Sequence, residues 1–167
     1  GLPVDASQFV LAIISRLTDQ KGLDLIDQVM NDICQDGVQF VILGTGDDRY
    51  ETMFKYYQEI HPHKISANIY YSEERSHKVY AGADAMLVPS RFEPCGLTQL
   101  MSLRYGTIPI VRETGGLRDT VEPYKEYEKK GTGFSFANYK AEELLATINY
   151  AKDVFYNDKE NWYGIQE

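Results

Sequence analysis

The chain has 167 residues, of which 43% are hydrophobic and 25% are charged, and 17 Lys and Arg against 25 Asp and Glu give a formal net charge of −8. A chain of this size and composition buries enough surface for one ordinary globular domain without disulfides or a structural metal, and disordered and collagen-like classes are excluded. The acidic balance argues against a general nucleic-acid binder or a protein of anionic membrane surfaces, because both need a basic face.

The longest clean apolar run, Phe9–Ile14, is far shorter than the roughly 20 residues that cross a bilayer, so we expect no membrane-spanning segment. The two cysteines, Cys34 and Cys95, form neither a metal-ligand cluster nor a disulfide framework, which fits a reducing compartment. The chain begins with Gly rather than Met, and we expect it to be a piece of a longer protein.

Short apolar runs alternate along the chain with stretches of helical period. Strands are predicted at residues 9–14, 39–43, 65–71, 85–88, 107–111 and 133–136. Helices are predicted around Leu23 to Ile33, Tyr50 to Tyr57, Glu73 to Tyr80, Leu97 to Met101 and Leu144 to Phe155, with a short helix after Thr114-Gly115-Gly116. Residues 122–130 are predicted as a solvated loop or short surface helix and residues 157–167 as a frayed tail.

The strands are continuous apolar runs, which is typical of strands buried on both faces. The predicted fold class is therefore α/β, a Rossmann-like open parallel sheet with helices on both faces, formed by a single domain over residues 1–167. In such sheets ligands bind beyond the carboxyl ends of the strands, so functional residues are expected just after the apolar runs.

One candidate site follows the strand at 85–88. Arg91, Glu93 and Cys95 lie in a loop bounded by prolines, and a helix opens at about Gly96. The first backbone amides of that helix, those of Gly96, Leu97 and Thr98, can bind an anion such as phosphate. The alternative is an ordinary helix start whose Leu97, Leu100 and Met101 pack on the sheet.

A second candidate follows the first strand, where Arg16 and Lys21 stand five residues apart. In an acidic domain this pair can supply the charge that a diphosphate needs. The alternative is that Arg16 pairs with Asp19 or Asp24 while Lys21 extends into water.

Other motifs are weaker. The segment 44–48, "GTGDD", lacks a third glycine and a Walker lysine and is interpreted as a turn and helix cap. His61, His63 and His77 lack ligand-spaced companions and are interpreted as surface residues, and Gly-x-Ser-x-Gly is absent. Tyr70 and Tyr71 are expected to end the third strand, where one of them either stacks on a nucleobase or is simply a strand aromatic.

Four segments, "SRLTDQKGLDL", "VILGTGD", "VPSRFEPCGLTQL" and "RETGGLRDTV", occur in this order and spacing. With them the chain resembles bacterial glycogen synthases and plant starch synthases over nearly its whole length. The resemblance implies the C-terminal, nucleotide-sugar-binding half of a retaining GT-B glycosyltransferase. That family transfers glucose from ADP-glucose, or UDP-glucose in some members, to the 4-hydroxyl end of an α-1,4-glucan without a cofactor or metal.

The resemblance also implies roles for single residues. Arg16 and Lys21 would hold the donor diphosphate, and Glu93 would complete the catalytic set. The backbone of Gly96, Leu97 and Thr98 would bind the distal phosphate, Glu93 and Cys95 would lie beside the glucosyl group, and Tyr71 would stack on the adenine. Glu93 would bind a sugar hydroxyl, stabilise positive charge at the anomeric carbon or act as nucleophile. The resemblance assigns no ligand contact to Arg91.

Many GT-B relatives carry a second Glu eight positions after the first, where this chain has Met101, as glycogen and starch synthases usually do. The family's N-terminal domain, with its part of the glucan cleft, is expected as a missing partner, so the fragment should bind nucleotide without transferring glucose. A bacterial cytoplasmic location is expected, or a plastid if the source is a plant. The alternatives are another GT-B glycosyltransferase, a sugar-nucleotide epimerase, or a noncatalytic nucleotide- or glucan-sensing module.

Overall fold

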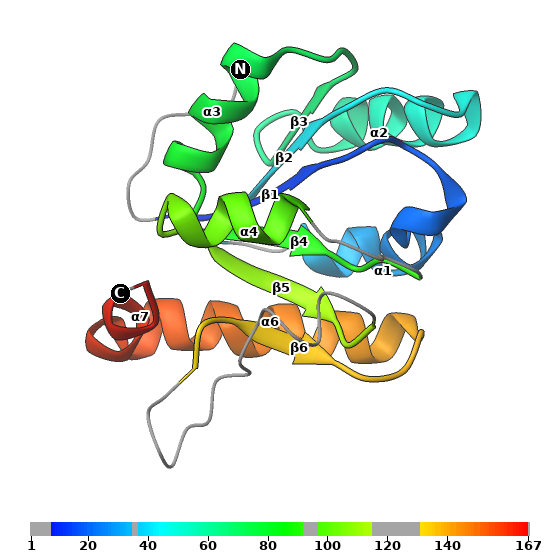
Figure 1. Ribbon diagram of the computed structural model, residues 1–167. Helices are drawn as coiled ribbons and strands as arrows, with labels where there is room; N and C mark the ends of the chain where they lie inside the picture. Colours follow the sequence, from blue (N-terminus) through cyan, green and yellow to red (C-terminus); the bar gives the residue numbers. More distant parts are fainter. Residues whose placement is uncertain (1–7, 35–36, 92–96, 115–130, 167) are drawn as a thin grey trace.

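A computed structural model describes residues 8–34, 37–91, 97–114 and 131–166 of the chain (Figure 1). Within these residues six parallel strands form one open sheet in the order β3-β2-β1-β4-β5-β6. The strands are β1 (Phe9–Ile14), β2 (Val38–Leu43), β3 (Ile65–Asn68), β4 (Ala85–Val88), β5 (Ile108–Arg112) and β6 (Phe134–Phe136). The helices are η1 (Asp19–Lys21), α1 (Leu23–Ile33), α2 (Asp48–Ile60), α3 (Glu73–Gly82), α4 (Leu97–Arg104), α6 (Ala141–Asn157) and α7 (Lys159–Gln166).

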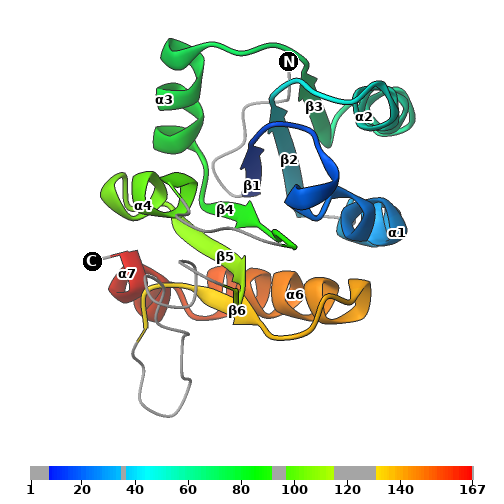
Figure 2. The same ribbon diagram turned by 45° about the vertical axis from the view of Figure 1, so that its right-hand side comes forward.

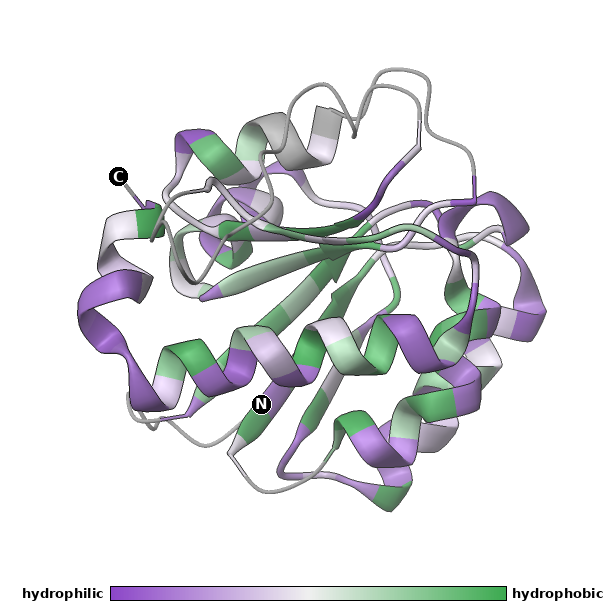
Figure 3. Cartoon of the chain, turned by 90° about the horizontal axis from the view of Figure 1, so that it is seen from below, coloured by the Kyte–Doolittle hydropathy of each residue, from purple (hydrophilic) through white to green (hydrophobic). Residues whose placement is uncertain are grey.

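Helices cover both faces of the sheet, with α3 and α4 on one side and α1, α2 and α6 on the other (Figure 2). The larger core lies under α1, α2, α6 and α7, and a smaller one under α3 and α4. Every residue of β4 is buried, as are the first four of β5, and Figure 3 shows the strands as mainly hydrophobic ribbons between helices of mixed hydropathy. The predicted Rossmann-like open parallel sheet with helices on both faces is confirmed.

Two expectations about the ends of elements are wrong. The third strand ends at Asn68 rather than at Tyr71, because its partner β2 ends at Leu43 and the Gly44 amide makes the next bond, 3.1 Å to the Asn68 carbonyl oxygen. Tyr70 and Tyr71 therefore lie in the connection to α3 rather than in the sheet.

The predicted frayed tail is instead the helix α7. Its Trp162 is 1% exposed and packs against the rings of Phe9, Phe134 and Phe155, with ring centres 5.3 to 6.2 Å apart. Asp158 precedes the helix and its carboxylate accepts from the Asn161 amide at 3.4 Å. The packing of Trp162 against the three phenylalanine rings buries the indole and thereby orders the segment.

None of the helices in the described residues is long and apolar enough to cross a membrane. The short helix predicted after Gly116 and the solvated loop over 122–130 lie outside these residues.

Candidate functional site

The chain reverses its direction of winding between β1 and β4, the two central strands. Starting from β1 the sheet grows through β2 to β3 on one side, and starting from β4 it grows through β5 to β6 on the other. The connections that leave the carboxyl ends of β1 and β4 therefore diverge and open a crevice, which is where doubly wound sheets bind ligands.

Among the described residues, two cavities lie at this edge of the sheet. The smaller, about 10 Å³, lies between the ends of β1 and β4 and is lined in part by Lys21, Ser90 and Thr98. The larger, about 210 Å³, lies at the ends of β1 and β2 and is lined in part by Arg16, Tyr71 and Thr98. Thr98 borders both cavities, so the predicted residues Arg16, Lys21, Tyr71 and Thr98 are brought to one continuous edge.

The loop after β1 is fixed by close backbone packing against the loop after β2. The Leu17 amide donates to the Thr45 carbonyl at 2.9 Å, and the Asp47 amide donates to the Leu17 carbonyl at the same distance. A Cβ on Gly46 would lie 2.4 Å from the Leu17 carbonyl oxygen. The glycine-rich segment 44–48 thus forms the predicted turn. Its small residues also allow the loops after β1 and β2 to come into contact.

The cap of α2 differs in detail from the expected one. Asp47 stands at the N-cap position without a side-chain cap bond, and the Glu51 carboxylate instead accepts from the Gly46 amide at 2.8 Å. Glu51 in the first turn of α2 therefore ties the helix to the preceding turn at Gly46.

Gly22 fixes the end of the first loop. Its φ is +75°, and a Cβ there would lie 2.0 Å from the Pro89 carbonyl oxygen. Only glycine combines this left-handed backbone with so close an approach. The contact sets the half-buried Lys21 against the end of β4.

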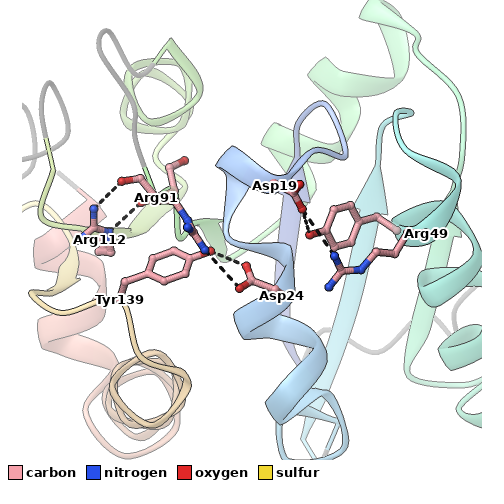
Figure 4. A network of polar contacts seen from close by, with 8 residues as sticks. Asp19, Asp24, Arg49, Arg91, Arg112 and Tyr139 are labelled. Carbon is pink, nitrogen blue, oxygen red and sulfur yellow. Dashed lines mark hydrogen bonds and ion pairs between the residues drawn. The ribbon is translucent and has the colours of Figure 1, made fainter.

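Asp19 in η1 and Asp24 in the first turn of α1 have partners other than Arg16 (Figure 4). Asp19 lies 3.8 Å from Arg49 and accepts from the Tyr50 hydroxyl, and Asp24 lies 3.7 Å from Arg91. The two carboxylates that the alternative reading offered to Arg16 are thus engaged by cations from later in the chain.

Tyr139 completes this network, since its hydroxyl donates to Asp24. Burial, together with that hydrogen bond, raises the pKa of Tyr139 to about 12. The hydroxyl therefore stays protonated and keeps donating to Asp24 above about pH 10, where an ordinary tyrosine ionises.

The loop after β4 is described as far as Arg91, and α4 begins at Leu97, close to the predicted helix start. Glu93, Cys95 and Gly96 lie outside the described residues, as does the Leu97 side chain. The Thr98 side chain is half-buried and hydrogen bonds to the hydroxyl of the buried Tyr80. Thr98 is thereby held at the boundary of the two cavities.

Tyr71 is 79% exposed and lies at the mouth of the larger cavity, where a flat ligand has access to its ring. The histidines are dispersed: His61 faces Asn31 at 3.1 Å, His77 faces the Tyr105 hydroxyl at 2.6 Å, and His63 is exposed. Across the part of the chain that the structure describes, no three His, Cys, Asp or Glu side chains are grouped so as to hold a metal.

Sequence reasoning missed Arg112 and Tyr139. Arg112 ends β5 and donates to the carbonyls of Ser90 and Arg91, which belong to the candidate site. The sequence does show that Arg112 is a positive charge at the carboxyl end of a buried strand, which is where site residues are expected, but this pattern alone assigns Arg112 no role.

The family profile described as glycosyl transferases group 1 matches residues 2–157. The chain belongs to the group 1 glycosyl transferases. Among its relatives, this glycosyl transferase is 65% identical over 165 residues to a glycogen synthase of Lachnospira eligens and 60% identical over 165 residues to one of Lachnoclostridium phytofermentans. Each match covers 99% of this chain and 34% of the relative, so the chain spans about a third of their length.

Solved structures agree with this assignment. The catalytic domain of starch synthase IV from Arabidopsis thaliana, bound to ADP and acarbose, superposes with a TM-score of 0.90 at 31% identity, covering 99% of this chain and 35% of that one. The C-terminal domain of a group 1 family protein from Francisella tularensis shares the fold, with a TM-score of 0.74 at 13% identity, and the match covers 99% of this chain and 90% of that one. The resemblance to glycogen and starch synthases is confirmed, and the fold is that of one half of a GT-B glycosyltransferase.

Proposed function

We propose that this group 1 glycosyl transferase is the donor-binding, C-terminal half of a glycogen synthase. The complete enzyme would transfer glucose, with retention, from ADP-glucose to the 4-hydroxyl end of an α-1,4-glucan. The observation that carries the proposal is the high identity to glycogen synthases over 99% of this chain. The crevice supports it, because Arg16, Lys21 and Thr98 line neighbouring cavities there.

The proposed chemistry follows from charge. Breaking the bond between the anomeric carbon and the diphosphate leaves negative charge on the departing diphosphate. Lys21 and Arg16 would stabilise that charge, together with the first amides of α4, and they need little reorganisation because the loops that carry them are already fixed. Side-chain cations fill this role in the proposal, which requires no metal or cofactor.

The roles of the remaining predicted residues are part of the same proposal. The Tyr71 ring would stack on the adenine, and the ADP in the starch synthase IV structure supports that base over uracil. Glu93 would act beside the glucosyl group with Cys95, while the backbone of Gly96, Leu97 and Thr98 would bind the distal phosphate. A nucleotide sugar, an α-glucan acceptor and an N-terminal domain are the proposed partners, and identity to bacterial glycogen synthases supports a bacterial cytoplasm.

Two experiments test the proposal. Calorimetric titration of the 167-residue chain should show binding of ADP and ADP-glucose and weaker binding of UDP, with no glucan extension by the chain on its own. Absence of nucleotide binding, or glucan extension by this chain, would contradict it.

In the complete protein, Lys21→Ala or Arg16→Ala should lower turnover by about 10²–10³, as for other groups that stabilise transition-state charge. Lys55→Ala is the matched control, because Lys55 is exposed on α2 and its substitution makes the same change in charge. Losses below tenfold in both site variants would remove them from this role.

A further inference from the structure

The Arg112 side chain joins the end of β5 to the loop after β4. Its Nε donates to the Ser90 carbonyl at 2.9 Å and one terminal nitrogen donates to the Arg91 carbonyl at 2.6 Å. The other terminal nitrogen donates to the Ala137 carbonyl at 3.3 Å. One guanidinium thus binds three carbonyl oxygens from two segments that are distant in sequence.

The same short segment, Ser90 and Arg91, is held from the opposite side by the first loop. The Arg91 amide donates to the Gln20 carbonyl at 2.8 Å, and Gly22 lies against Pro89. The Arg91 guanidinium also lies 3.7 Å from Asp24. The loop that carries Lys21 and the loop that leads to α4 are therefore fastened to each other as well as to Arg112.

The Tyr139 ring contributes an aromatic face to this cluster (Figure 4). The guanidinium carbons of Arg91 and Arg112 lie 4.6 and 5.5 Å from its centre. Its hydroxyl donates to Asp24, the carboxylate that pairs with Arg91. The ring thereby keeps both guanidinium groups in place while Asp24 balances part of their charge.

We propose that Arg112 is a positioning residue that holds the Ser90–Arg91 backbone against the Lys21 loop and so presets the crevice for the nucleotide. The inference rests on the proposed function, since the nucleotide is the ligand for which the crevice is preset. The Ser90–Arg91 backbone lies beyond the end of β4, so the sheet does not hold it in place. A loop that is already ordered before the nucleotide binds avoids the entropy cost of becoming ordered on binding. Each nitrogen of the Arg112 guanidinium donates to a carbonyl oxygen, so we assign Arg112 a role through the loop rather than as a charge on the diphosphate.

Two substitutions distinguish these roles in the 167-residue chain. Arg112→Lys keeps the positive charge but cannot bind the three carbonyls in this geometry. Arg112→Gln removes both the charge and the planar guanidinium that binds them. Positioning predicts that both variants raise the Kd for ADP by about tenfold, since hydrogen bonds to charged groups are commonly worth at least that factor. The matched control is Arg104→Gln, because Arg104 is exposed at the end of α4.

Amide hydrogen exchange supplies a readout that does not depend on nucleotide. The Arg91 amide, which donates to Gln20, should exchange about tenfold faster in both Arg112 variants, while the Ile110 amide in the buried strand β5 keeps its rate. Equal acceleration at Ile110 would mean a general loss of stability and would overturn positioning.

The outcomes separate the inference from the proposed function. If the unsubstituted chain binds ADP and Arg112→Lys binds it within threefold, the three carbonyl contacts are not needed for binding and the inference is overturned. If the unsubstituted chain does not bind ADP, the proposed function fails, and the exchange rate of Arg91 then decides whether Arg112 fixes the loop. Unchanged Arg91 exchange in both variants overturns the inference in either case.

Discussion

Replacing Gly22 by Ala tests whether the approach of two backbones shapes the crevice. Gly22 has φ +75°, and an added Cβ would lie 2.0 Å from the Pro89 carbonyl oxygen. The left-handed backbone by itself costs a residue with a side chain about 1–2 kcal/mol. Because real Cβ atoms keep at least 3.0 Å from such an oxygen, one of the two backbones must also move by about 1 Å.

That movement displaces Lys21 and Ser90, which line the small cavity on either side of the contact. Losing one charge-assisted hydrogen bond to a diphosphate costs about 1.5–3 kcal/mol, or roughly tenfold to a hundredfold in affinity. We therefore expect Gly22→Ala to weaken ADP binding by at least tenfold in calorimetric titration, although every charged side chain remains.

Gly106→Ala is the matched control for this experiment. Gly106 has φ +74°, and the nearest atom to an added Cβ, the Gln166 carbonyl oxygen, is 3.9 Å away. It precedes β5 at the opposite edge of the sheet from the crevice. This variant should lose about 1–2 kcal/mol of unfolding free energy in urea and keep its ADP affinity. If Gly22→Ala binds ADP within twofold of the unsubstituted chain, or if Gly106→Ala weakens binding equally, the reasoning is refuted.

Three further outcomes follow from individual side chains. Tyr71→Ala should weaken ADP binding by roughly 0.5–1.5 kcal/mol because it removes an aromatic face at the cavity mouth, and an unchanged Kd would exclude stacking there. Trp162→Ala should lower the unfolding free energy by about 3–5 kcal/mol in urea, whereas Tyr163→Ala, at a side chain 59% exposed, should stay within about 0.5 kcal/mol; equal effects would mean that α7 is not docked. Burial and hydrogen bonds to carboxylates raise the pKa of Tyr57 and Tyr139 to about 12. Between pH 10 and 12 the unfolded chain releases protons that the folded chain keeps, so the unfolding free energy should fall as pH rises through this window, and ultraviolet titration of the folded chain should show tyrosines that ionise late.

Strand positions could be predicted from the sequence because parallel strands between two helical layers need apolar residues on both faces. β4 and β5 satisfy this along almost their whole length. The third strand was predicted too long because Ile69, Tyr70 and Tyr71 continue its apolar character after the neighbouring strand has ended. Strand propensity is local, whereas the end of a strand depends on its partner.

The last helix was missed for a related reason. Trp162 and Ile165 are the buried residues of an eight-residue helix, which is too few for a periodic pattern. The burial of Trp162 depends on Phe9 and Phe134, which lie far away in the sequence, as well as on the nearby Phe155.

The candidate site could be located in part. The rule that ligands bind at the carboxyl ends of strands placed Arg16, Lys21 and Thr98 correctly at one edge, and the structure adds that Asp19 and Asp24 have other partners. The support from Arg112 depends on the pairing of β4 with β5 and could not be deduced from spacing. The roles of Arg16, Lys21, Tyr71 and Thr98 toward a ligand stay predictions, as do those of Glu93 and Cys95.

The pairing of β1 with β4 joins residues 74 positions apart, Leu11 with Ala85, and Tyr139 meets Asp24 from 115 positions away. During synthesis the first three strands can associate as they leave the ribosome, but the crevice beyond β1 and β4 forms only after residues 85–98 have emerged, and the Tyr139 contact forms later still. Under the proposed function, an intermediate that lacks β4 would not yet bind the nucleotide, so bound nucleotide would indicate that the crevice has formed. Saturating nucleotide should accordingly protect the finished domain against unfolding while leaving its early assembly steps untouched.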